Sequence, residues 1–238
     1  MPRFRFLDHP GLIPFAHRGN AAGNVENTLA AFQAVVDLGY RYVETDVRTT
    51  RDGKLVVFHD RTLERIAGVD REVGTLRYAE LTDLAVPLLT DVLETFPDVR
   101  FNVDMKDWPS VDALAAVIEA TTSIDRLCAA SFSERRLRRI RRLAGPELCT
   151  SAGVAGVARF VLRWPGPIGG AAAVQVPASL ARPSLVERAR RLHLHHHVWT
   201  LNDRDSIVRA VRAGVDGIMT DEPLLLKDVL EALGRWVA

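Results

Sequence analysis

The segment 41-RYVETDVRTTRDGKLVVFHD-60 contains two β-rich apolar runs with a tight turn between them. The first run carries Glu44 and Asp46 at alternate positions near its end, so both side chains are expected on the same face of a strand. The Asp52-Gly53 pair favours a short turn, which predicts that residues 55–58 fold back on the extension of the first run as a β-hairpin. The hairpin therefore returns His59 to the end of the strand that bears the carboxylates.

Similar β-rich runs alternate with helical segments along the whole chain, which is typical of parallel βα units. Eight strands are predicted at 13–16, 42–46, 101–105, 127–131, 148–150, 172–176, 196–200 and 217–220. Eight helices are predicted at 28–38, 90–96, 111–121, 134–143, 154–162, 184–192, 204–213 and 223–233, with Ser110, Ser133 and Asp203 as N-caps and Gly39 and Gly214 as stops. This pattern predicts an α/β fold, a (β/α)8 TIM barrel with one hairpin excursion and a short insertion at about residues 61–87.

Composition narrows the class of protein. With 238 residues, of which 47% are hydrophobic, the chain can bury a full core, and we expect residues 1–238 to form a single domain. A formal net charge of +1 gives no overall field that would attract nucleic acid. The first nine residues mix charged and aromatic side chains without an apolar run, so we expect a cytoplasmic protein with no stable membrane insertion, leaving peripheral membrane contact open. Cys128 and Cys149 stand in apolar runs and are predicted core residues.

Polar side chains gather where the predicted strands end. In a TIM barrel the chemistry lies at the carboxyl ends of the strands. His17 and Arg18 follow the first strand directly, and Asp104 and Lys106 repeat the alternate spacing at the end of the third. These residues are therefore expected to converge with Glu44, Asp46 and His59 on one rim. Taken separately, the same charges could be ordinary rim residues, and Lys106 could simply pair with Asp104.

The carboxylates predict a site for a hard cation. Glu44, Asp46 and Asp104 form an all-oxygen set, which suits Mg²⁺ or Ca²⁺, with Mn²⁺ as an alternative, and suits zinc or copper poorly. Without a cation, three neighbouring carboxylates would repel one another. Bound to a phosphodiester oxygen, such an ion would neutralise charge and polarise phosphorus. Arg18 and Lys106 can add positive charge to the same clamp, so a small-molecule phosphodiester is the expected partner.

Two histidines complete the set. Displacement at phosphorus is in-line, so one group activates the nucleophile while another protonates the leaving alkoxide opposite. We assign His17 as base or nucleophile and His59 as acid, although the residue pattern itself leaves the order open. Glu26 is expected to brace Arg18 or the metal site, and Asn27-Thr28 is either a substrate contact or the N-cap of the first helix.

Two other concentrations of ionisable residues are expected to be structural. Among the histidines at 193, 195, 196 and 197, only His195 and His197 could converge, and no carboxylate or cysteine accompanies them. The arginine-rich segment 135–142 carries an apolar stripe, which predicts an outer helix with a solvated face. A patch that binds a membrane surface or an acidic partner is the alternative for that helix.

The sequence motifs of the predicted site, in their order along the chain, resemble those of the glycerophosphodiester phosphodiesterase family over nearly the whole chain. The matching motifs are His17-Arg18-Gly19, Glu26-Asn27-Thr28, Glu44-x-Asp46, Asp52-Gly53, His59-Asp60, Thr62-Leu63-Glu64-Arg65, Asn102 to Lys106, Ser131-Phe132, Val198 to Asn202 and Gly214 to Asp221. The resemblance implies a barrel fold, a divalent metal held at positions 44, 46 and 104, two catalytic histidines, and release of an alcohol from glycerol 3-phosphate. It also matches Trp199 to an aromatic side chain that lines the substrate pocket of the family.

Three positions depart from the family pattern: the change at Val25 should only loosen its loop, and the other two concern the identity of the substrate. Val25 stands where relatives usually have proline, the insertion after His59 is short, and Asp104 stands where the phosphodiesterase branch usually has glutamate. Aspartate at this position resembles the sphingomyelinase D-like branch. An alternative activity is therefore phospholipase D-like cleavage of lysolipid or sphingomyelin head groups through a cyclic phosphate. A non-catalytic barrel that binds a phosphate ligand is a second alternative, because fold alone does not imply chemistry.

Overall fold

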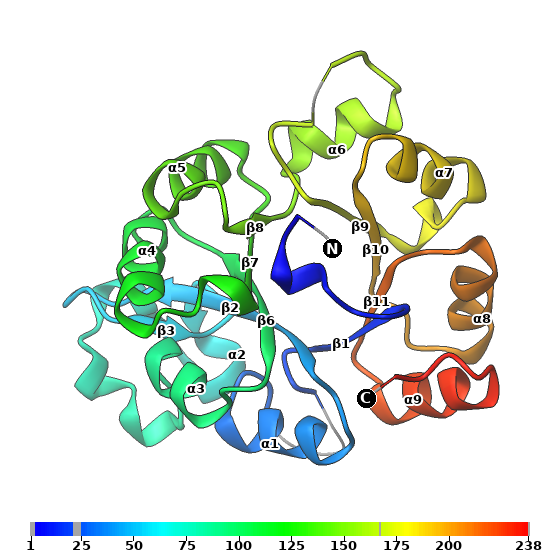
Figure 1. Cartoon of the computed structure of the whole chain (residues 1–238). Coiled ribbons are helices and arrows are strands. Elements are labelled where there is room, and N and C mark those ends of the chain that lie inside the picture. Colours follow the sequence, from blue (N-terminus) through cyan, green and yellow to red (C-terminus); the bar gives the residue numbers. More distant parts are fainter. Residues whose placement is uncertain (1–2, 21–24, 167, 238) are drawn as a thin grey trace.

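The computed structural model describes residues 3–20, 25–166 and 168–237 (Figure 1). Eight parallel strands form a nearly closed barrel, and their hydrogen-bonded order is β8-β7-β6-β2-β1-β11-β10-β9. The strands are β1 (Ile13–His17), β2 (Tyr42–Thr49), β6 (Arg100–Met105), β7 (Leu127–Ala130), β8 (Cys149–Thr150), β9 (Ala173–Pro177), β10 (His195–Trp199) and β11 (Gly217–Thr220). The predicted TIM barrel is confirmed, with boundaries shifted by no more than a few residues. That residues 1–238 make up a single domain stays a prediction.

The barrel closes between its shortest strand and β9. Ser151 and Ala173 form an isolated parallel bridge, and Ala152 N–H donates to Ala173 O at 2.8 Å. Ala172 N–H donates to Thr150 O at 2.8 Å on the other side of the bridge. The first and last strands lie side by side, with Ala16 opposite Thr220.

Helices surround the barrel (Figure 1). They are α1 (Leu29–Asp37), α3 (Leu89–Thr95), α4 (Pro109–Thr121), α5 (Glu134–Ala144), α6 (Val154–Val161), α7 (Pro183–Arg191), α8 (Arg204–Ala213) and α9 (Pro223–Ala232). Within the described ranges, no helix is long and apolar enough to cross a lipid bilayer.

Most predicted helix ends are correct, and one is wrong. Ser133 and Asp203 accept hydrogen bonds from backbone N–H groups three residues later, and Gly214 ends α8 in the left-handed conformation. Ser110, however, lies inside α4, which begins at Pro109. Proline suits the first helical position because its φ is already fixed and its missing N–H is not needed there. The cap oxygen comes instead from Asp107, whose Oδ1 accepts from Ser110 N–H at 2.9 Å.

The predicted hairpin is present. β3 (Leu55–Val57) pairs antiparallel with the extension of β2 and places Val57 opposite Val47. The chain then enters the insertion, which contains β4 (Thr62–Leu63), α2 (Glu64–Ala67), β5 (Val69–Glu72) and the 3-10 turns η2 (Val73–Thr75), η3 (Tyr78–Glu80) and η4 (Thr82–Leu84). Val73, Leu76 and Leu81 are fully buried against Val56, so the insertion has a small apolar core of its own.

The N-terminal segment covers the end of the barrel where the strands begin (Figure 1). The short turn η1 (Arg5–Leu7) inserts Phe6, which is completely buried. Its ring lies 6.3 Å from that of Phe15 and 5.5 Å from that of Tyr42, and its carbonyl oxygen accepts from Tyr42 Oη at 2.9 Å. Cys128 and Cys149 are buried in the same apolar cluster, as predicted.

Candidate active site

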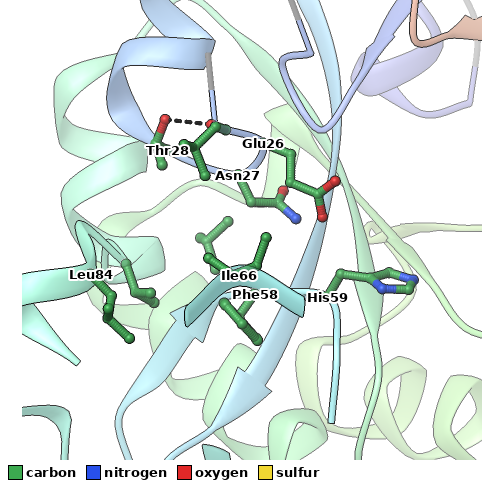
Figure 2. A pocket seen from close by; sticks show the side chains of 10 residues that line it. Glu26, Asn27, Thr28, Phe58, His59, Ile66 and Leu84 are labelled. Atoms are coloured by element: carbon green, nitrogen blue, oxygen red, sulfur yellow. Dashed lines mark hydrogen bonds between the residues drawn. The ribbon is translucent and has the colours of Figure 1, made fainter. Parts of the chain in front are cut away.

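An open cavity of about 490 Å³ lies at the carboxyl ends of the strands. Its polar wall consists of His17, Arg18, Glu44, Asp46, His59, Asp104 and Lys106, and its apolar wall includes Phe132, Val154, Val157, Pro177, Trp199 and Met219. The structure therefore brings eight of the ten predicted site residues to one cavity. The other two, Glu26 and Asn27, lie behind it and line a small cavity between the first loop and the insertion (Figure 2).

Asp46 is the centre of the polar wall. Lys106 Nζ lies 2.8 Å from Asp46 Oδ1 and 2.7 Å from Asp104 Oδ2, so the ammonium group bridges two carboxylates. Arg18 Nε lies 3.0 Å from the second oxygen of Asp46. Burial alone would raise the pKa of Asp46, but the charges of Lys106 and Arg18 outweigh burial and lower it. Asp46 is therefore held as a carboxylate.

Glu44 has the opposite electrostatic environment. Burial, followed by the negative charge of Asp46, raises the pKa of Glu44 to about 8. Its Oε2 atom and Oδ1 of Asp104 are buried without a hydrogen-bond partner among the described residues. Such orphaned carboxylate oxygens are costly unless something positive contacts them. The polar wall thus has unsatisfied carboxyl oxygens beside two cationic side chains.

These donors fit a hard cation by their chemistry. Oxygen ligands from carboxylates are what Mg²⁺, Ca²⁺ and Mn²⁺ take in proteins. As the side chains lie, however, no group of three His, Cys, Asp or Glu residues within 3–20, 25–166 and 168–237 has the arrangement of a metal site. Lys106 instead lies between Asp46 and Asp104 and pairs with both. Pairing with Asp104 is the alternative role that the sequence analysis left open for this lysine.

His17 is fixed by a carboxylate that the sequence analysis did not select. Its Nδ1 lies 2.5 Å from Asp221 Oδ1, and its Nε2 faces Glu44 Oε2 at 3.5 Å. Asn202 Nδ2 donates to the other oxygen of Asp221 at 2.8 Å. Burial lowers the pKa of His17, but Glu44 and the hydrogen bond to Asp221 outweigh burial and raise it. Asp221 directly follows β11, the last strand, and β11 pairs with β1, the strand that ends at His17. In a barrel these two strands are expected to be neighbours, so the place of Asp221 after the last strand could have predicted that it lies near His17.

His59 has the same kind of support. Its Nδ1 lies 2.7 Å from Asp60 Oδ1. In Figure 2 its ring points away from the small cavity that Phe58, Ile66 and Leu84 line. Both histidines thus bind a carboxylate through Nδ1, so chemistry in the large cavity falls to Nε2, which in His17 also faces Glu44 at 3.5 Å.

The turn after β1 sets the position of Arg18. Arg18 and Gly19 have φ values of 56° and 64°, and Arg18 N–H donates to Glu44 O at 2.8 Å. A Cβ atom at Gly19 would lie 2.5 Å from a ring carbon of Phe32. Glycine therefore allows α1 to pack closely against the turn that presents Arg18 to Asp46.

Asn27 and Thr28 have different roles. Thr28 is the N-cap of α1, and its Oγ1 accepts from Ala31 N–H at 3.2 Å. Asn27 is buried, donates to Asp46 Oδ2 at 3.1 Å and accepts from Thr45 Oγ1 at 2.8 Å. Glu26 Oε1 accepts from Arg18 Nη1 at 3.1 Å. The loop thus supports the polar wall from behind.

The other ionisable clusters lie apart from the cavity. His197 is completely buried 5.1 Å from the ring of Phe15, and burial lowers its pKa well below its usual value. On α5, Arg139 pairs with Asp112 and Arg141 pairs with Glu134. These partners agree with the structural interpretation of the histidines and of the arginine-rich helix.

Comparison with known proteins gives one family. The profile described as the glycerophosphoryl diester phosphodiesterase family matches residues 17–150 and 167–225. A probable glycerophosphodiester phosphodiesterase 2 from Mycobacterium tuberculosis is 35% identical over 257 aligned positions, covering 99% of this chain and 97% of the relative. A glycerophosphodiester phosphodiesterase from Caldanaerobacter subterraneus is 29% identical, with 93% and 99% covered. The crystal structure of a protein described as a glycerophosphoryl diester phosphodiesterase from Silicibacter pomeroyi has a TM-score of 0.85 at 24% identity, covering 98% of this chain and all of the other, and supports the fold.

Proposed function

The chain belongs to the glycerophosphoryl diester phosphodiesterase family and is an enzyme of this class, and from this premise we propose that it hydrolyses glycerophosphodiesters to an alcohol and sn-glycerol 3-phosphate in the large cavity. One observation carries the proposal. Two histidines, each bound through Nδ1 to an aspartate, line a single cavity together with three carboxylates and two cationic side chains. A non-catalytic phosphate-binding barrel would not need this pair of oriented histidines.

The two histidines would divide the proton transfers. His17 Nε2 takes a proton from water as the water oxygen forms a bond to phosphorus. The bond between phosphorus and the oxygen of the leaving alcohol breaks, and His59 Nε2 supplies the proton which that alkoxide needs. Asp221 and Asp60 hold the rings in place and stabilise the positive charge that each ring carries when it is protonated.

The polar wall would bind the phosphate. Arg18 offers a planar fork of donors and Lys106 a point charge, and both can face phosphate oxygens. Glu44, Asp46 and Asp104 would hold a divalent cation, Mg²⁺ or Ca²⁺ with Mn²⁺ as an alternative. When bound, that cation would neutralise phosphate charge and polarise the phosphoryl group. Asn27 and Glu26 would keep Asp46 and Arg18 in position from behind.

Removing divalent cations is expected to abolish turnover, because the phosphoryl group would then lose the charge neutralisation and polarisation that a cation beside Glu44, Asp46 and Asp104 would supply. The test is release of sn-glycerol 3-phosphate from glycerophosphocholine, glycerophosphoethanolamine and glycerophosphoglycerol, before and after treatment with EDTA. Adding back Mg²⁺, Ca²⁺ or Mn²⁺ separately should restore the rate and identify the preferred ion. Full activity after exhaustive chelation would contradict the role of the carboxylates, and no turnover with any ion would contradict the activity.

A second candidate activity is cleavage of lysolipid head groups. It is favoured by the apolar wall, where Phe132 and Val154 are 61% and 56% exposed at the cavity mouth, and by Asp104. A substrate hydroxyl could then replace water and yield a cyclic phosphate. Offering lysophosphatidylcholine in the same assay decides between the two: a cyclic product, or preference for the acyl-bearing substrate, would favour the second candidate.

A further inference from the structure

A polar chain connects the insertion to the loop after β1. Arg65, on the short helix α2, donates from Nε to Asp60 Oδ2 and from Nη2 to Glu26 Oε1, both at 2.6 Å. One guanidinium group thus holds two carboxylates that lie 34 positions apart in the sequence. Asp60 stands where the insertion begins, and Glu26 lies in the loop between β1 and α1. We propose that Arg65 is a positioning residue that fixes His59 for proton transfer by clamping Asp60 to Glu26.

The bonding around Asp60 supports this role. One oxygen of Asp60 accepts from Arg65, and the other lies 2.7 Å from His59 Nδ1. Burial would raise the pKa of Asp60, but the hydrogen bonds from His59 and Arg65 outweigh burial and lower it. Asp60 is therefore a carboxylate with both oxygens engaged, and the direction of its plane decides where the His59 ring points.

Glu26 supplies the fixed end of the clamp. Its Oε1 atom accepts from Arg65 and also from Arg18, whose Nε lies 3.0 Å from Asp46. The loop that carries Glu26 is itself held, because Asn27 beside it is buried and bonded to Asp46 and Thr45. His59 is thereby linked to the phosphate-binding wall through Asp60, Arg65 and Glu26.

The seam under this clamp is otherwise mainly apolar. Val57, Phe58, Ile66, Leu84 and Val86 line most of the small cavity between loop and insertion, which has a volume of about 10 Å³ (Figure 2). Apolar contact is not directional, so it can keep the two parts together without setting the angle of the His59 ring. The directional bonds of the guanidinium fork can set that angle.

If Arg65 only formed a surface ion pair, its replacement would leave kcat at the wild-type value. Arg65 is 48% exposed, and exposed pairs contribute little to stability. Arg61 provides a matched control, because it also stands in the insertion and pairs with Glu72 at 2.5 Å, yet Glu72 contacts neither histidine. Replacing Arg61 removes an arginine and an ion pair from the same part of the fold without touching the clamp.

The experiment compares R65M, R65K and R61M in kcat, KM and Tm. It rests on the proposed function, so wild type and H59A are measured in the same assay. We expect R65M to lower kcat by about 10- to 100-fold with KM within about threefold and Tm almost unchanged, R65K to recover part of the loss, and R61M to equal wild type. If Arg65 acts through His59, R65M should add little further loss in the H59A background.

The outcomes separate the two proposals. The role of Arg65 is overturned if R65M has the wild-type kcat. It is also overturned if R61M lowers kcat as much as R65M does, or if R65M lowers kcat in the H59A background as much as it does in the wild type. An H59A enzyme with wild-type kcat overturns the proposed acid instead. If the wild-type enzyme is active, H59A is inactive and R65M has the wild-type kcat, only the role of Arg65 is rejected and the role of His59 stands.

Discussion

Replacing His17 with glutamine is expected to lower kcat by about 10²- to 10⁴-fold, because glutamine cannot exchange a proton with the reacting groups. Glutamine keeps the polarity of the side chain and can still meet Asp221, so the fold should be preserved. Initial rates of sn-glycerol 3-phosphate release at saturating substrate measure the effect, with Tm recorded for each preparation.

His193→Gln is the matched control for this substitution. His193 is exposed in the loop before β10, at the end of the barrel opposite the cavity, and its replacement should leave kcat at the wild-type value. An H17Q enzyme that keeps more than a tenth of the wild-type kcat would contradict the assignment of His17.

Phe6→Ala is expected to reduce the free energy of unfolding by about 3–5 kcal/mol, the usual cost of removing a fully buried aromatic side chain. Phe6 is completely buried between the rings of Phe15 and Tyr42, and its neighbours cannot collapse into the space because they belong to barrel strands. Urea unfolding followed by fluorescence and circular dichroism gives the difference from wild type.

Phe132→Ala makes the same chemical change where the side chain is 61% exposed. Its effect on stability should stay within about 0.5 kcal/mol of wild type. If F6A lost less than about 1 kcal/mol, the N-terminal segment would contribute little to the closed end of the barrel.

Local sequence patterns were sufficient to predict the barrel. Each strand is a short β-rich run with helical periodicity after it, and the Asp52-Gly53 turn alone predicted that β3 pairs antiparallel with β2. Ser110 was wrongly predicted as a cap because Pro109 and Asp107 compete for the same helix start, and only the backbone geometry shows which of them prevails.

Part of the site could be predicted because alternate residues on a strand share a face. That rule placed Glu44 beside Asp46 and Asp104 beside Lys106, and all four line the cavity. Asp221 and Arg65 were missed because their contacts are tertiary: each depends on which distant segments become neighbours in the folded barrel. The ionic partners of Lys106 likewise depend on side-chain directions that spacing alone does not determine.

The pairing of β1 with β11 also has a consequence for biosynthesis. His17 and Asp221 are 204 positions apart, so the bond that orients this histidine joins two segments that are translated far apart in time. A nascent polypeptide could bury much of its core on the ribosome and still lack the aspartate for His17 until β11 has emerged. Activity should therefore appear only after β11 and Asp221 have emerged, and a chain truncated before residue 221 should lack an oriented His17.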